Sequence, residues 1–310
     1  MITALARRFI KNYENVKDPA VRQSYGVLCG AVGIGFNLLL FLGKFSAGLL
    51  SGSIAVTADA FNNLSDAGSS VITLLGFQLA GKKPDSGHPF GHGRIEYISG
   101  LVVSLAILLM GVELGRTSFL KILNPEPVDF SLLAVGILVA SICVKLYMAS
   151  YNSAVGKKID SAAMRATATD SLSDTMATSG VLLSMLLVRF ANLNVDGWFG
   201  LVVAALICFA GYKAAKETIS PLMGQPPTPE FVDSIRNYVM SHDKVLGYHD
   251  LIVHDYGPGR RMVSLHVEVP VSMGFMAAHD MIDNIEIGLG HRLGCDVTIH
   301  MDPIDTDDRK

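Results

Sequence analysis

The sequence has 310 residues, of which 50% are hydrophobic and only 17% are charged, and its mean hydropathy is +0.40. Soluble domains carry about 25% charged residues, so this composition favours a lipid bilayer as the solvent for part of the chain. The net charge of −3 and the lack of a basic face in the sequence argue against a nucleic-acid-binding protein.

Residues 1–24 mix basic and acidic side chains without a cleavable apolar core, so we expect a cytoplasmic segment and no secretory signal. Six apolar stretches follow, each close to the roughly 20 residues that a membrane-spanning helix needs. They lie near 25–50, 54–80, 97–120, 130–150, 161–190 and 198–217. Basic residues collect in alternate loops, which predicts a multi-pass protein of the cell (inner) membrane with both termini in the cytoplasm.

The character of the sequence changes after Pro226 and Pro227, where a small soluble domain is expected. Its predicted elements are a helix over 229–242 with Thr228 as N-cap, strands over 247–255 and 261–269, a helix over 275–291 and a strand over 295–301. About 80 residues are few for a lone fold, so a partner surface is expected. The predicted organisation is a cytoplasmic segment 1–24, a transmembrane domain 25–220 and a cytoplasmic domain 221–310.

Acidic and amide side chains interrupt the second and the fifth apolar stretch. Asp170 and Asp174 are four residues apart, so they share one helix face and both carboxylates can reach one cation. The second stretch repeats this spacing twice, in Asn62 with Asp66 and in Asp59 with Asn63, and spacing alone leaves the register open. A charged aspartate at the bilayer centre costs about 2.5–3.5 kcal/mol, so these pairs predict a site where a divalent cation or protons offset the charge.

Residues 85–96, after the second stretch, contain His-Pro-Phe-Gly-His-Gly and resemble the signature of the cation diffusion facilitators. These proteins are metal/proton antiporters, and the resemblance covers nearly the whole chain. It implies an α-helical membrane protein of six transmembrane helices followed by a small cytoplasmic α+β ferredoxin-like domain. It further implies a homodimeric secondary active transporter, not an enzyme. In the implied register Asn62 and Asp66 of the second span face Asp170 and Asp174 of the fifth.

These four residues offer only oxygen ligands. Zinc favours nitrogen and sulfur, and zinc transporters of the family usually carry a histidine on one of these two spans. Hard oxygen sites suit Mg²⁺, Ca²⁺ and Mn²⁺, of which Mn²⁺ most needs an efflux route, and the ligand set resembles the manganese branch of the family. We therefore expect Mn²⁺/H⁺ antiport by alternating access, because proton and metal compete for the same oxygens. Zn²⁺, Fe²⁺, Co²⁺ and Cd²⁺ are alternative cargoes.

The loop after the second stretch holds Asp85, His88 and His92. Their spacing suits a metal site, for which relatives use this loop, and it equally suits turn and helix-cap contacts. The cysteines form no CxxC pair, so a thiolate zinc site is not expected.

Histidines also recur in the soluble domain. His300 and Asp302 alternate along one predicted strand and so point to one face, which His249 and His266 on the other strands can join. The resemblance implies that these four residues and His279 form a cytoplasmic metal site at the dimer interface.

One position departs from the family pattern. Some relatives lock the dimer by pairing a basic residue at the start of the third span with an acid just after the sixth. Arg94 matches the basic position, but Gly224 takes the place of the acid, which argues against this interlock.

A membrane-anchored metal sensor is the rival from a different functional class. In a sensor the spans serve only as an anchor, and an anchor does not need four polar ligands on two helices.

Overall fold

The computed structural model describes residues 2–16, 18–51, 54–124, 132–191 and 196–305. They divide into two compact units, Met1–Lys82 with Ile95–Ile219, and Lys83–Arg94 with Ser220–Lys310. The second unit therefore combines the C-terminal region with a loop that connects two helices of the first.

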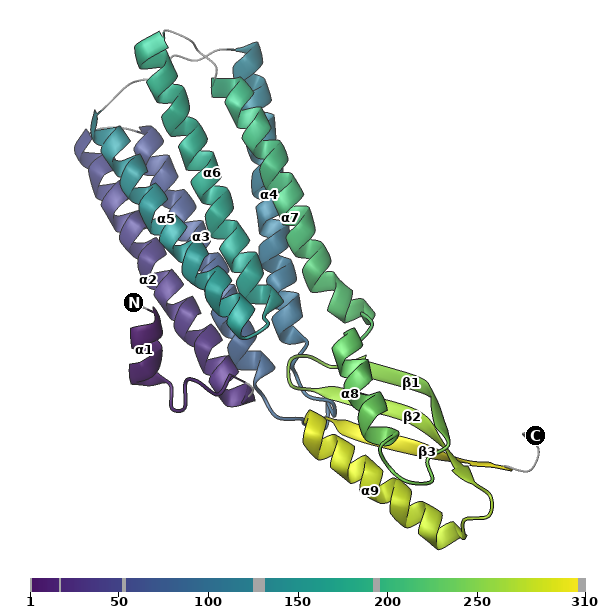
Figure 1. Cartoon of the computed structure of the whole chain (residues 1–310). Coiled ribbons are helices and arrows are strands. Elements are labelled where there is room, and N and C mark those ends of the chain that lie inside the picture. The colour runs from purple at the N-terminus through teal and green to yellow at the C-terminus, as the bar shows by residue number, and fades with distance from the viewer. Residues whose placement is uncertain (1, 17, 52–53, 125–131, 192–195, 306–310) are drawn as a thin grey trace. The chain divides into compact units, whose positions relative to one another are not determined.

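One short helix and six long helices, packed side by side, form the first unit (Figure 1). They are α1 (Ile2–Phe9), α2 (Pro19–Ser51), α3 (Ile54–Ala80), α4 (Ile95–Leu123), α5 (Leu132–Lys158), α6 (Ala162–Ala191) and α7 (Asp196–Met223). Four of them, α2, α4, α5 and α7, are long and apolar enough to cross a membrane. The predicted fold class is confirmed, although the expected start of the fourth span at residue 130 lies outside the described residues.

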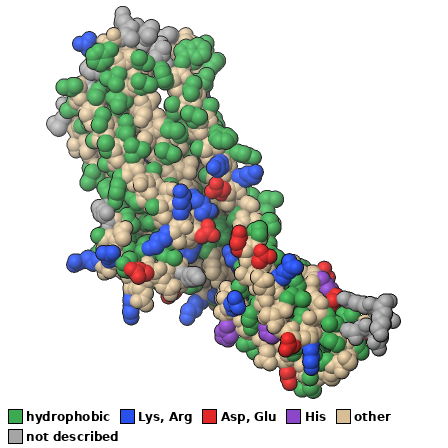
Figure 2. Space-filling view, viewed as in Figure 1, with side chains coloured by type: hydrophobic (Ala, Val, Ile, Leu, Met, Phe, Trp, Pro, Cys, Tyr) green, Lys and Arg blue, Asp and Glu red, His purple; other side chains and the backbone are tan. Residues whose placement is uncertain are grey.

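Burial in the helical unit differs from that in a soluble protein, because many polar side chains lie inside it and many large apolar ones face outward. The buried face of α3 is polar and includes Asn63, Asp66 and Ser70, which recur at helical spacing. Large apolar side chains instead point outward: Leu109 is 72% and Phe209 is 69% exposed. Figure 2 shows hydrophobic side chains over most of one face of this unit. This pattern suits a bundle that is surrounded by lipid, in which polar groups must find partners inside.

The helices α2 and α3 approach each other closely because α2 carries small residues at the contact. A Cβ atom added to Gly26 would lie 2.2 Å from Cγ of Phe77, and one added to Gly30 would lie 2.8 Å from Cβ of Leu74. The Gly-xxx-Gly spacing thus provides the close packing that it indicates in membrane helices.

The second unit is a three-stranded sheet with two helices. Its elements are α8 (Pro229–Val239), β1 (Gly247–Asp255), β2 (Arg261–Pro270), α9 (Phe275–Leu293) and β3 (Asp296–Ile304). The strand order is β1-β2-β3, with β1 antiparallel and β3 parallel to β2. The predicted order of elements is confirmed, and Thr228 caps α8 by accepting a hydrogen bond from the Phe231 N–H at 3.4 Å. The helix expected over 229–242 ends three residues earlier, at Val239.

The two faces of this sheet differ in chemistry. Alternate residues of β2, such as Leu265 and Val267, form one core with Ile235 of α8 and Ile285 of α9. The residues between them, including His266, lie on the opposite face. Figure 1 shows both helices on one side of the sheet, so neither of them covers the face that carries His266.

The contact between α2 and α3 can be tested with two glycines of the same helix. We expect Gly26→Ala to lower the apparent Tm of the purified protein in detergent, because overpacking costs about 1–3 kcal/mol. Gly35→Ala is the matched control, since nothing lies within 4 Å of a Cβ atom at that position. Equal Tm values for the two variants would contradict this view of the contact.

Candidate metal centres

Three buried carboxylates from two helices meet inside the helical unit. Asp66 of α3 and Asp170 and Asp174 of α6 each present an oxygen, and these three atoms lie within 4.8 Å of one another. Their residues are 7%, 8% and 4% exposed, so water screens the charges poorly. Such a cluster has the charge and the ligand chemistry for a hard divalent cation.

The same cluster contains a residue that the sequence analysis missed. Lys145 of α5 is 3% exposed, and its Nζ donates hydrogen bonds to Asp66 Oδ2 and Asp174 Oδ2, both at 2.7 Å. The other oxygen of Asp174, Oδ1, is buried and has no hydrogen-bond partner within the described part of the chain. A charged residue in the middle of a long apolar helix was the available signal, because intramembrane ionisable residues are rare and paired.

The amide side chains of α3 are arranged differently from the expected register. Asn62, the expected fourth ligand, is exposed, whereas the adjacent Asn63 is 1% exposed and faces the interior. The side chain of Asp59 lies outside the described residues. The structure therefore brings together three of the four expected transport-site residues and leaves Asn62 at the surface of the single chain.

Hydroxyl groups join α3 to α6 close to the carboxylates. Oγ1 of Thr73 and Oγ1 of Thr167 lie 2.9 Å apart and are both buried. Thr167 precedes Asp170 by one helical turn, so this hydrogen bond helps to fix α6 against α3 where their carboxylates meet.

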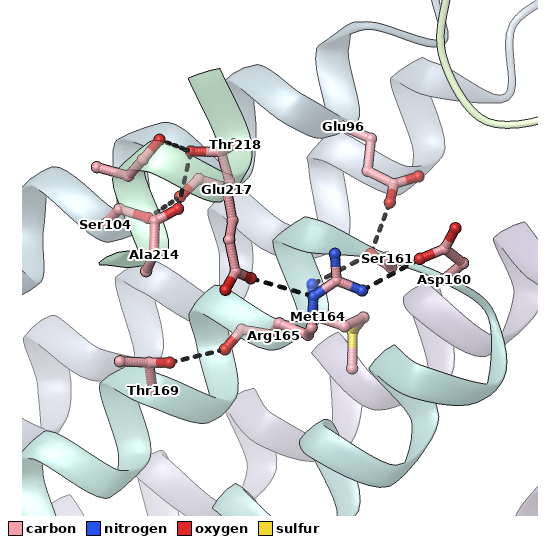
Figure 3. A network of polar contacts seen from close by, with 12 residues as sticks. Glu96, Ser104, Asp160, Ser161, Met164, Arg165, Thr169, Ala214, Glu217 and Thr218 are labelled. Carbon is pink, nitrogen blue, oxygen red and sulfur yellow. Dashed lines mark hydrogen bonds and ion pairs between the residues drawn. The ribbon is translucent and has the colours of Figure 1, made fainter. Parts of the chain in front are cut away.

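A second polar network lies at the end of the bundle where α5 turns into α6. Arg22 of α2 forms a two-pronged ion pair with buried Glu96 of α4, which also accepts a hydrogen bond from Ser161 Oγ at 2.6 Å. Figure 3 shows Arg165 between Asp160 and Glu217. Its Nη1 lies 3.2 Å from Asp160 Oδ1, and its Nε lies 3.3 Å from Glu217 Oε2. This network ties α2, α4, α6 and α7 together, which gives the bundle a rigid polar end.

The loop residues Asp85, His88 and His92 form a cluster in the second unit. A carboxylate oxygen of Asp85 lies 3.6 Å from His88 Nδ1, and the other lies 3.5 Å from His92 Nε2. Backbone N–H groups of His88 and Gly87 donate to Asp85, and these hydrogen bonds hold its pKa below the ordinary range. The carboxylate is therefore ionised at neutral pH and available as a ligand.

Three histidines form a row across the open face of the sheet. His249 pairs with His266 on β2, which pairs with His300 on β3. Asp302 lies beside them: its carboxylate is 3.0 Å from His249 Nε2, 2.9 Å from His266 Nδ1 and 3.3 Å from His300 Nε2. The hydrogen bond from His266 is the main cause of a lowered pKa of Asp302. His279 lies on α9 and is exposed, outside this cluster.

Arg94 has partners within the second unit. Its guanidinium donates to the backbone carbonyl of Asp255 at 2.7 and 3.0 Å and lies over the Tyr256 ring, 4.7 Å from the centroid. The close approach requires glycine at position 257, where a Cβ atom would lie 2.3 Å from the backbone of Gly93. Arg94 thus fastens the loop to the end of β1.

Known proteins resemble the chain over most of its length. The cation efflux transmembrane domain matches residues 31–223, and the cation efflux protein cytoplasmic domain matches residues 227–304. An uncharacterized transporter of Methanocaldococcus jannaschii, MJ0449, is 34% identical over 83% of this chain and 89% of its own length. The cation-efflux pump FieF of Yersinia enterocolitica is 28% identical over 86% of this chain and 88% of the pump. FieF of Escherichia fergusonii is 27% identical over 91% of this chain and 95% of its own length.

The histidine row on the sheet gives a testable prediction. We expect Asp302→Asn to weaken Zn²⁺ binding at this cluster at least about tenfold, because a neutral amide replaces the carboxylate shared by three imidazoles. Isothermal titration of the full chain measures the change, with the exposed His291→Ala as control. Equal Zn²⁺ affinity in Asp302→Asn and the parent would rule out this role.

Proposed function

We propose that this chain, which belongs to the cation efflux family (the cation diffusion facilitators), exports Mn²⁺ in exchange for protons. As a member of this family the protein is a divalent cation efflux transporter and not an enzyme. It is a multi-pass protein of the inner membrane, and its cytoplasmic domain forms a homodimer.

The observation that carries the proposal is the carboxylate cluster of Asp66, Asp170 and Asp174. Three buried acids from two helices are costly inside a bilayer unless a cation compensates them. All three offer oxygen, which favours Mn²⁺ over the softer Zn²⁺ among the expected cargoes. Asn62 remains the proposed fourth ligand, and its amide would have to turn inward to bind because it is exposed in the single chain.

Proton exchange needs no further residue in this scheme. Carboxylates bind metal in their ionised form, so protons and Mn²⁺ compete for the same oxygens. Metal enters the cluster from the cytoplasm while the bundle is open to that side. When the bundle is open to the other side of the membrane, protons from that side displace the metal from the carboxylates.

Both termini face the cytoplasm, the transmembrane domain spans residues 25–220, and residues 221–310 bind metal and dimerise. The histidine row with Asp302 is proposed as a regulatory metal site, together with His279. The cluster of Asp85, His88 and His92 is proposed as a weaker metal site, and the closeness of its ligand atoms, which lie within 4.8 Å of one another, supports that role.

Metal preference is tested by uptake into proteoliposomes. We expect the wild-type protein to transport Mn²⁺ faster than Zn²⁺, and Asn62→His to shift the ratio toward Zn²⁺ because it adds a nitrogen ligand. Zinc flux equal to manganese flux in the wild type would overturn the manganese assignment.

The role of the carboxylate cluster is tested at Asp170. Asp170→Asn should slow Mn²⁺ flux at least about a hundredfold, because it removes one of three buried charges that attract the ion. Asp160→Asn is the matched control: this residue lies just before the same helix, and its side chain is 90% exposed, so loss of its ion pair with Arg165 should have little effect. Normal Mn²⁺ flux in Asp170→Asn would contradict the assignment of this cluster as the transport site.

A further inference from the structure

Lys145 lies in the middle of the buried face of α5, between Ser141 and Met148. The most apolar 18-residue stretch of this helix has a mean hydropathy of 2.2, so a lysine at the helix centre is unusual. A buried ammonium inside a membrane protein is expensive and is retained where it has a function. We therefore looked for a role of Lys145 in transport among the groups that it contacts.

The partners of Lys145 are the carboxylates of the proposed cargo site. Its Nζ bridges Asp66 Oδ2 on α3 and Asp174 Oδ2 on α6, at 2.7 Å from each. A divalent ion bound to the same two oxygens, at about 2.1–2.6 Å, would lie next to the ammonium. The two cations would repel each other at this short distance, so they compete for Asp66 and Asp174.

We propose that Lys145 is a tethered competitor of the cargo, and that a metal ion reaches Asp66 and Asp174 by displacing its ammonium. This inference rests on the proposed function only in that cargo binds at the carboxylate cluster; it does not depend on which metal is carried.

Two carboxylate groups are available to the incoming ion before it displaces Lys145. Asp174 Oδ1 is buried without a hydrogen-bond partner among the residues described, and Asp170 presents a third carboxylate within 4.8 Å. An ion can therefore bind these oxygens first and then take over the two that Lys145 holds. The exchange avoids a stage in which three buried carboxylates face one another without a cation.

Charge selectivity follows from the same arrangement. A tethered ammonium has a high effective concentration, so a monovalent ion of equal charge gains nothing by replacing it. A divalent ion is attracted twice as strongly by the carboxylates and prevails. Lys145 thereby excludes Na⁺ and K⁺ and weakens the binding of divalent cargo enough for release.

The test is equilibrium Mn²⁺ binding to the full-length homodimer in detergent, followed by the paramagnetic resonance of free Mn²⁺. Each variant is compared with the same variant carrying Asp170→Asn, so the difference reports the carboxylate cluster and not the histidine clusters. We expect Lys145→Met to bind Mn²⁺ at this site at least about tenfold more tightly than wild type. In Lys145→Met, NaCl should weaken Mn²⁺ binding more than choline chloride does. In wild type, the two salts should weaken Mn²⁺ binding equally.

Two further variants serve as controls. Lys145→Arg keeps the charge and should bind Mn²⁺ no more tightly than wild type. Ser141→Ala alters the same buried face one turn away and should leave the affinity unchanged. If Lys145→Met does not assemble, Lys145→Gln, whose amide can still donate to Asp66, carries the same comparison.

Failure of the inference differs from failure of the proposed function. Unchanged or weaker Mn²⁺ binding in Lys145→Met, with Asp170-dependent binding in wild type, overturns the competitor role alone. Absence of Asp170-dependent binding in both proteins overturns the cargo site, and the competitor with it. Binding that appears only in Lys145→Met supports the inference.

Discussion

Repulsion among three buried carboxylates is the constraint on which the helical unit depends. Asp66, Asp170 and Asp174 bring their oxygens within 4.8 Å of one another in a region with little access to water. Lys145 contacts the cluster with one positive charge, and the buried Lys44 of α2 also attracts Asp66. Two lysines do not balance three carboxylates, and a proton or a divalent cation can supply the missing charge. Such a site is suited to binding and releasing an ion.

Contacts in the rest of the bundle hold this cluster in place. Polar side chains of α3 and α6 turn inward and bond to one another, as Thr73 and Thr167 do, while large apolar residues face outward. Small residues of α2 let α3 approach closely. The buried ion pair of Arg22 with Glu96 joins α2 to α4 at one end of the bundle. A rigid frame of this kind lets two helices carry the ligands without losing their alignment.

The regular elements could be predicted because their patterns are local. Spans follow from length and apolarity, and the strands of the second unit follow from alternation. Contacts between distant segments could not be deduced in this way. The short helix α1, whose Ile2 and Ala6 pack in one cluster with Val21 and Tyr25, was not expected in a segment of mixed charge. Lys145 was missed because a single lysine has no spacing partner, although its position inside an apolar span was visible.

The central claim is that cargo binds between α3 and α6. The most direct measurement is anomalous diffraction from crystals of the full chain grown with Mn²⁺. The account predicts a manganese peak within about 2.1–2.6 Å of carboxylate oxygens of Asp66, Asp170 and Asp174. Manganese found at His249, His266 and Asp302 but not between the helices, at a concentration that supports transport, would contradict it.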